Sequence, residues 1–272
     1  MCRWLAYAGP PILLERLLFE AENSLIEQSL SSRMGRAVTN GDGFGIGWYG
    51  GRAIPGQYRD IFPAWNDANL RSLAEQIESP LFFAHVRAST GTSTARVNCH
   101  PFRHGPWLFM HNGQIGDYLK IRREIDHSIA PEFYPYREGS TDTEALFYLA
   151  LAHGLATDPL AAITATIADV EGMMAAGDCT SAFRMTVAAS DGTRIIAYRY
   201  SSDNDSPSLY TIRGKALAER IGGDDLAKQT GGDAVLVLSE PLDEDTDDWT
   251  EVPDGHMLIA QDGNITLTPI PL

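Results

Sequence analysis

The stretch MCRWLAYAGPP, residues 1–11, places a cysteine directly before a run of residues that is typical of a buried strand. We expect this strand to end at the Gly-Pro-Pro of residues 9–11. Because the side chain at position 2 is small, removal of Met1 would leave Cys2 with a free α-amine of reference pKa about 8. One residue would then supply both a nucleophile and a base. Many proteins begin Met-Cys, and a small buried strand residue explains Cys2 equally well when it is considered alone.

The first half of the chain alternates between helical and extended patterns. Apolar spacing and turn residues separate the expected elements. These are a helix over 13–30 with a break near Asn23, a tight glycine-rich loop entering a strand in NGDGFGIGWYGG at 40–51, a helix over 69–78, a strand in LFFAHVRA at 81–88, and a strand in WLFMHNG at 107–113.

A helix is expected over residues 141–153, because Thr141 and Glu144 have the spacing of a capping box and the apolar pattern ALFYLALAHGL follows them. A second helix is expected over 157–176. From residue 182 onward the pattern is extended, with Asp-Gly hairpin signals at 191–192 and 262–263. Strands at both ends and helices between them predict one layered α+β domain over residues 1–272, mainly antiparallel, with no fused synthase domain.

Composition excludes several classes of function. The chain has 272 residues and a formal net charge of −15, which argues against binding to the phosphate backbone of nucleic acids. No apolar run approaches membrane-spanning length and no signal peptide is evident, so we expect a cytoplasmic protein. We interpret the acidic run at 243–248 as a solvated loop. Three widely spaced cysteines predict neither a disulfide framework nor a metal site, and Cys99 and Cys179 are expected to be inert packing thiols.

Three further segments could carry amide chemistry. Asn112 and Gly113, at a strand end, could donate to an oxyanion, although an ordinary Asn-Gly turn is the simpler interpretation. Arg87 could bind a carboxylate with help from the Thr90 hydroxyl, or it could be a surface arginine. Asp142, in the first turn of a capped helix, could bind an ammonium group, or could lie there because the helix dipole favours a carboxylate.

The order of these segments decides between the interpretations. Cys2, NGDGFG, HVRAST, HNG and STDTE, in this order, resemble the class II glutamine amidotransferases of the N-terminal nucleophile hydrolase superfamily. MCRWLAYAGPP, NCHPF, HNGQI and SEPLD look most like the short, stand-alone subgroup that includes the γ-glutamyl amidohydrolase of ergothioneine biosynthesis. The resemblance is specific from Met1 to about His153 and looser beyond.

The resemblance implies a role for each candidate residue. Cys2 would attack the amide, and Asn112 with Gly113 would form the oxyanion hole. Arg87 with Thr90, and Asp142, would hold the amino-acid head of the substrate. The implied fold is a four-layer αββα sandwich with two mainly antiparallel sheets, and no cofactor or metal is implied.

The sequence departs from the better-known members of this family in two places. Ala88 and Gly91 stand where those members carry a tryptophan and a histidine, which puts their lid and coupling behaviour in doubt. Residues 40–43, Asn-Gly-Asp-Gly, replace the usual Arg-Gly-Pro/Gln-Asp loop of those members. The family's fold and amidase chemistry are therefore expected with more support than its coupling to a second active site.

We expect hydrolysis of the γ-amide of glutamine or of a γ-glutamyl conjugate through a γ-glutamyl thioester. One alternative is a glutaminase subunit that passes ammonia to a separate synthase. Another is an N-terminal cysteine amidase of the bile-salt or penicillin-acylase type, which a clamp for a zwitterion would serve poorly. A third is a catalytically silent glutamine-binding or scaffold protein.

Overall fold

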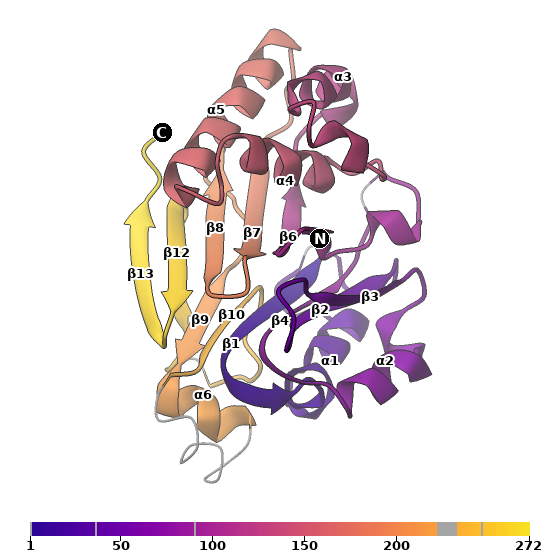
Figure 1. Ribbon diagram of the computed structural model, residues 1–272, viewed down its shortest axis with the longest axis vertical. Coiled ribbons are helices and arrows are strands. Elements are labelled where there is room, and N and C mark those ends of the chain that lie inside the picture. Colours follow the sequence, from indigo (N-terminus) through magenta and orange to yellow (C-terminus); the bar gives the residue numbers. More distant parts are fainter. Residues whose placement is uncertain (1, 36, 90, 222–232, 246) are drawn as a thin grey trace.

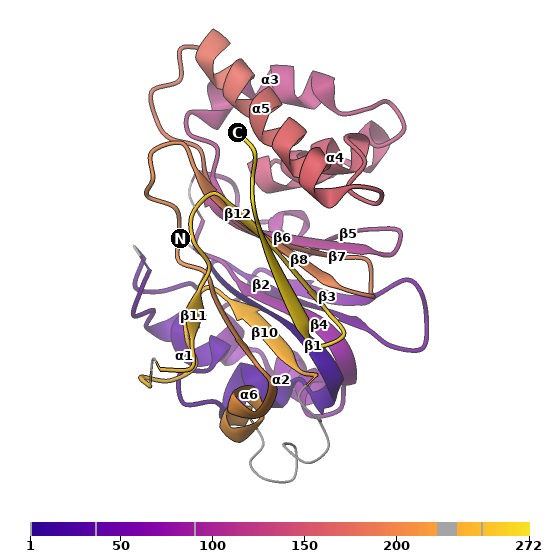
Figure 2. The ribbon, with the colours of Figure 1, turned by 90° about the vertical axis from the view of Figure 1, so that its left-hand side faces the viewer.

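The computed structural model describes residues 2–35, 37–89, 91–221, 233–245 and 247–272. Two antiparallel sheets lie face to face between two layers of helices, so the chain has the αββα order of layers (Figure 2). Helices α3, α4 and α5 cover the outer face of one sheet, and α1, α2 and α6 cover the outer face of the other. The expected α+β sandwich is confirmed.

Among the described residues, one sheet has seven strands in the order β11-β9-β10-β1-β4-β2-β3, and the other has six in the order β13-β12-β8-β7-β6-β5 (Figure 1). We call them the seven-stranded and the six-stranded sheet. Their strands are β1 Arg3–Leu13, β2 Phe44–Tyr49, β3 Gly56–Asp60, β4 Glu78–Val86, β5 Phe102–His104, β6 Trp107–Gln114, β7 Arg184–Ser190, β8 Ile195–Ser201, β9 Tyr210–Arg213, β10 Val235–Leu238, β11 Thr250–Glu251, β12 His256–Gln261 and β13 Asn264–Pro269.

The helices belong to the two outer layers and to the connections between strands. In chain order they are a π-helical turn at Arg16–Glu20, α1 Leu25–Leu30, α2 Ala68–Ala74, α3 Tyr118–Ser128, α4 Asp142–Ala152, α5 Pro159–Ala176 and α6 Gly214–Ile221, with 3-10 turns at Ala64–Asn66, Arg96–Asn98 and Tyr134–Tyr136. Within the described parts of the chain, no helix has both the length and the apolarity needed to cross a membrane.

Strand β1 explains how the layers are held together. Its side chains alternate, so Leu5 and Tyr7 pack toward the helical layer while Trp4 and Ala6 pack between the two sheets. Strand β6 of the other sheet does the same. Phe109 faces the α3–α5 layer, and the flanking even-numbered residues face the space between the sheets. Each central strand therefore contributes to two cores at once.

The predicted end of the first strand at residues 9–11 is wrong. Strand β1 continues to Leu13, and its register against β4 shifts between Ala8 and Ile12. This irregularity accommodates the two prolines, since a bulge leaves a position without a ladder hydrogen bond. The carbonyl of Pro10 instead accepts a hydrogen bond from the Tyr7 hydroxyl at 2.7 Å.

Other boundaries agree more closely. The predicted helix over 13–30 is broken between the π-helical turn and α1, as expected near Asn23. The predicted helix over 69–78 is shorter, because α2 ends at Ala74 and β4 already begins at Glu78. Both Asp-Gly signals form hairpins, between β7 and β8 and between β12 and β13.

The start of α4 is capped by the Thr141 hydroxyl, which accepts from the Glu144 backbone N–H at 3.2 Å. In a capping box the Glu144 carboxylate would accept from the backbone N–H of Thr141, but here it has other partners. It accepts from the backbone N–H groups of Glu138 and Gly139, at 3.0 and 2.8 Å, and pairs with Arg137 at 2.8 Å. The glutamate therefore secures the loop that leads into the helix.

The described residues of the acidic run at 243–248 form a loop in which Glu244, Asp245, Asp247 and Asp248 are exposed, so the expected solvated loop is confirmed, with an added connection to α6. Asp243 and Asp248 pair with Arg220 of α6, at 2.6 and 2.8 Å. Asp243 also accepts from the Trp249 indole at 2.9 Å. The run thus ties helix α6 to the segment before β11, although the Asp248 carboxylate remains about half exposed.

Candidate active site

Cys2 lies directly before β1, and its Sγ is 3.6 Å from the backbone carbonyl oxygen of Ala88. If the alternation of β1 is continued back by one residue, Cys2 falls on the side of Trp4, between the two sheets. Burial raises the pKa of the Cys2 thiol, while the positive charges of Arg87 and Arg3 act in the opposite direction. The contact with Ala88 places the thiol beside the segment that carries Arg87.

Arg87 is a buried residue just after β4, which excludes the interpretation as a surface arginine. Its Nη2 donates to the hydroxyls of Thr92 and Ser89, at 2.6 and 3.2 Å, and its Nη1 donates to the carbonyl of Asp42 at 3.3 Å. Within the described residues these bonds use three of the five N–H donors of the guanidinium. Thr90, predicted to assist Arg87, lies outside the described residues.

The glycine-rich loop before β2 holds the Arg87 segment. The backbone of Asp42 donates to the Arg87 carbonyl at 2.9 Å, and the Asp42 carboxylate accepts from the Ser89 N–H at 2.7 Å. Gly43 has φ +111°, and a Cβ there would meet the Cys99 sulfur at 2.7 Å. The loop therefore needs glycine at this position for its backbone to approach the neighbouring segments.

Asn112 is fully buried near the end of β6, and neither its Nδ2 nor its Oδ1 has a hydrogen-bond partner in the part of the chain that the structure describes. Its position in β6 has the same parity as Leu108 and Met110, which pack between the sheets. Buried amides are normally satisfied, so this side chain is notable as a donor without an acceptor. It lies in a regular strand paired with β7 and not in an isolated Asn-Gly turn.

Gly113 has φ +148°, and a Cβ at this position would overlap the carbonyl group of Arg184 on β7. No larger residue fits without movement of the backbone. The glycine allows β6 to approach β7 closely directly after Asn112.

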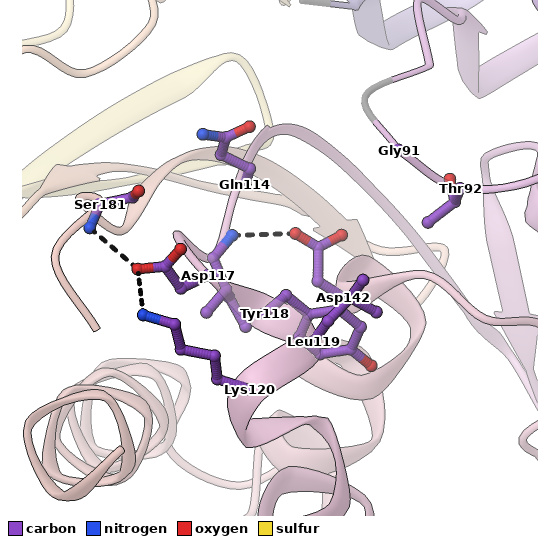
Figure 3. A pocket seen from close by; sticks show the side chains of 10 residues that line it. Gly91, Thr92, Gln114, Asp117, Tyr118, Leu119, Lys120, Asp142 and Ser181 are labelled. Carbon is purple, nitrogen blue, oxygen red and sulfur yellow. Dashed lines mark hydrogen bonds and ion pairs between the residues drawn. The ribbon is translucent and has the colours of Figure 1, made fainter. Parts of the chain in front are cut away.

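Asp142 lies in the first turn of α4. Its two oxygens accept from the backbone N–H of Ile115, at 2.9 Å, and from its neighbour Thr143, at 2.8 Å. It lines a cavity of about 310 Å³ (Figure 3). In this view Asp142 lies between Thr92 and the Asp117–Lys120 pair. The other residues lining the cavity are Gly91, Gln114, Ile115, Tyr118, Leu119 and Ser181.

Of the candidate residues in the described part of the chain, Asp142 lines this cavity, and the others are linked to it through neighbouring residues. Thr92, which accepts from Arg87, lines the cavity together with Asp142. Gln114, two residues after Asn112, lines it as well. Cys2, Arg87, Asn112 and Gly113 do not line this cavity, and the positions of Cys2, Arg87 and Asn112 have the parity of the residues that pack between the two sheets.

Three buried histidines underlie this region. His111 Nδ1 lies 2.9 Å from the Thr143 hydroxyl of α4, next to Asp142. His100 Nδ1 lies 2.7 Å from His85 Nε2. The partners of His100 and His111 thus lie on β4 and α4, and the contacts of His85 and Thr92 were not predicted from the sequence. A single histidine in a buried strand is not a recognisable pattern, so the sequence did not indicate a role for His85.

The similarity of this chain to known proteins shows its family. The sequence model described as class II glutamine amidotransferases matches residues 19–271. The chain belongs to the class II glutamine amidotransferases. It is an amidohydrolase of this family, as the resemblance of its motifs predicted. The match begins after residue 18, so it does not bear on the role of Cys2.

Two relatives cover almost the whole chain. The probable glutamine amidotransferase DUG3 of Saccharomyces cerevisiae is 34% identical, over 99% of this chain and 84% of its own. The γ-glutamyl-hercynylcysteine sulfoxide hydrolase of Mycolicibacterium smegmatis is 27% identical, over 99% of this chain and 100% of its own.

Solved structures agree with the fold. A glutamine aminotransferase class-II domain protein from Silicibacter pomeroyi has a TM-score of 0.74 and 36% identity, with 99% of each chain covered. The glutamine phosphoribosylpyrophosphate amidotransferase of B. subtilis has a TM-score of 0.62 at 16% identity. This chain spans half the length of that enzyme, and at this identity the likeness concerns the fold alone. The αββα sandwich is thus that of the N-terminal nucleophile amidotransferases.

Proposed function

We propose that this amidotransferase hydrolyses the γ-amide of a γ-glutamyl compound, with Cys2 as the nucleophile once Met1 has been removed. The observation that carries this proposal is the fully buried amide of Asn112, which has no hydrogen-bond partner among the described residues and has, like Cys2, the strand parity of the space between the sheets. A buried donor without an acceptor suits an oxygen that becomes negatively charged only during the reaction. We propose further that residues 1–272 act as one domain of this type.

Binding would rely on opposite charges at the two sides of the substrate's amino-acid head. The remaining N–H donors of Arg87 would bind the α-carboxylate, with Thr92 and Ser89 holding the guanidinium in place. Asp142 would accept from the α-ammonium, since its oxygens can accept more bonds than those from Ile115 and Thr143. This clamp would direct the γ-carbonyl inward, toward Cys2.

In the chemical step, the Cys2 thiol would transfer its proton to its own α-amine, directly or through water, and the thiolate would attack the γ-carbon. Negative charge on the carbonyl oxygen would be stabilised by the Asn112 side chain and the Gly113 N–H, each worth about 3 kcal/mol. The C–N bond would break as the leaving amine takes up the proton. Water would then cleave the γ-glutamyl thioester, which releases glutamate and restores the thiol.

The leaving group distinguishes two forms of this function. A γ-glutamyl conjugate is supported by the mycobacterial relative, which is named as a hydrolase of such a compound and is covered along its full length. Glutamine, with ammonia passed to a separate enzyme, is supported by the yeast relative, which is named a probable glutamine amidotransferase. We favour the conjugate, since that form needs no second active site.

The test is a comparison of kcat/KM for L-glutamine and for γ-glutamyl amides of increasing size, with wild-type protein and with Cys2→Ala. Wild type should cleave at least one γ-glutamyl amide faster than glutamine, and Cys2→Ala should cleave none while still binding L-glutamate. A strong preference for glutamine, together with activation by a co-purifying protein, would favour the ammonia-transferring form. Turnover by Cys2→Ala would exclude the proposed nucleophile.

A further inference from the structure

Arg3, the residue after the proposed nucleophile, is a fully buried arginine. On β1 it has the parity of Leu5 and Tyr7, so its side chain points away from the space between the sheets and toward the helical layer. Its Nη1 nevertheless returns to the backbone and donates to the carbonyl oxygen of Cys2 at 3.1 Å. The guanidinium thus holds the residue that precedes it.

The charge of Arg3 is balanced by Glu240, which is also buried. Arg3 Nε lies 3.1 Å from Glu240 Oε2 and donates to the Ser32 hydroxyl at 2.8 Å. The carboxylate accepts in addition from the Ser32 hydroxyl, the backbone N–H groups of Arg33 and Met34, and the Asn23 side chain, at 2.9 to 3.2 Å. Glu240 is therefore fixed by two segments distant from it in sequence.

The segment that carries Glu240 also holds the start of β1 through its backbone. Ser239 donates its backbone N–H to the Trp4 carbonyl at 3.0 Å, and its hydroxyl accepts from the Trp4 N–H at 3.2 Å. Residues 2–4 are thus held on one side by residues 239–240, which follow directly after β10. This attachment lies at the end of β1 that Cys2 directly precedes.

Stability alone is a weak explanation for the pair. Replacing a buried ion pair with apolar side chains of similar size is often neutral or stabilising, because both charges lose their hydration. Within the described residues the Arg3 Nη2 has no hydrogen-bond partner, so the pair is not optimised as a hydrogen-bonded unit. Its distinctive contact is the one to the Cys2 carbonyl.

We propose that Arg3 and Glu240 are positioning residues that orient Cys2 for attack, with Arg3 gripping the Cys2 carbonyl and Glu240 fixing Arg3. This inference rests on the proposed function of Cys2 as an N-terminal nucleophile. Once Met1 is removed, Cys2 is attached by a single peptide bond, and the orientation of that peptide decides where the thiol and the amine point. The Arg3 contact fixes this peptide.

The test compares kcat and KM of Glu240→Gln and of the double variant Arg3→Met/Glu240→Gln with wild type, on the better of L-glutamine and γ-glutamyl ethylamide. The double variant removes both charges together, and the glutamine amide oxygen can still accept from the donors around it, so the fold should persist. Both variants should lose about 100-fold in kcat through a displaced nucleophile. KM should stay within about twofold, since Arg87 and Asp142 are unchanged. The control Asp243→Asn, which weakens the Arg220 pair on α6, should keep wild-type kinetics.

The outcomes separate this inference from the proposed function. A folded double variant with wild-type kcat, or one in which only KM rises, would overturn the positioning role while Cys2→Ala remains inactive. Turnover by Cys2→Ala would overturn the proposed function and the positioning role together. A double variant with the thermal midpoint of wild type and low kcat is the expected result.

Discussion

The Nε2 atom of His85 lies 3.3 Å from the backbone carbonyl oxygen of His111, a contact that joins the two sheets one residue before Asn112. The same Nε2 lies 2.7 Å from Nδ1 of His100. A single N–H on His85 can donate to both acceptors if both rings are neutral. Burial accordingly lowers the pKa of His85 to about 3 and that of His100 well below its usual range. The backbone next to Asn112, the proposed oxyanion donor, is thus held by neutral imidazoles.

The lowered pKa values of His85 and His100 predict that the free energy of unfolding decreases in acid. In the unfolded chain they take up protons near pH 6.5, whereas His85 in the folded protein does so only near pH 3. Their contribution is therefore complete above pH 6.5 and declines as the pH falls toward 3. The free energy of unfolding should fall by about 1.4 kcal/mol per pH unit for each extra proton that the unfolded state binds. Denaturant unfolding at a series of pH values measures this slope.

The control for this prediction is His100→Gln, which keeps a polar side chain beside His85 but does not titrate. Its unfolding free energy should depend less steeply on pH between 6.5 and 4 than that of wild type. An unchanged slope would mean that His100 is already protonated in the folded protein.

Asn112→Ala should leave the protein folded and reduce kcat by about 100- to 1000-fold, the usual effect of removing one oxyanion donor. Because the Asn112 amide has no hydrogen-bond partner among the residues that the structure describes, its removal breaks none of their hydrogen bonds and should cost little stability. Steady-state kinetics and thermal unfolding measure the two effects. A large loss of stability with normal kcat would show that the amide has a structural role instead.

Gly113→Ala should lower both stability and activity, because the added Cβ would overlap the backbone of Arg184 and the positive φ disfavours alanine. Gly172→Ala is the matched control. That glycine lies inside α5 with open space around its Cβ position, and alanine there should stabilise the helix by about 0.5–1 kcal/mol. Comparable thermal midpoints for the two variants would contradict the close approach of β6 to β7.

Asp142→Asn should raise KM by about ten- to 100-fold, since a hydrogen bond to a charged group is worth about 1.5–3 kcal/mol. The asparagine oxygen can still accept from the Ile115 N–H, so the fold should persist. Asp117→Asn alters a second carboxylate of the same cavity, one that binds Thr180, Ser181 and Lys120, and should change KM much less. Equal effects of the two substitutions would remove the specific role of Asp142.

Local patterns in the sequence predicted much of the fold. The hairpins at 191–192 and 262–263 follow from the conformational freedom of their turn residues, and the Thr141 cap from a side chain that reaches its own helix. The end of β1 was not predictable in this way, because a bulge across residues 9–11 depends on pairing with β4. The task of Glu144 likewise depends on a loop whose path the sequence does not reveal.

The candidate site was predicted only as far as motifs and a family resemblance reach. Arg3 and Glu240 are separated by 237 positions and share no local pattern, so their pairing follows only from the place of β10 beside β1. The contacts of Arg87 to Thr92 and Ser89 depend on how the chain turns after β4. Neither set of contacts produces a regular spacing of residues that could be recognised in the sequence.

The most direct measurement of the central claim is the intact mass and the peptide map of native protein quenched with acid during turnover of a γ-glutamyl amide. The account predicts a chain without Met1 that carries one added glutamyl group, located on Cys2. An active preparation in which Met1 is still attached, or a glutamyl group found on another residue, would contradict it.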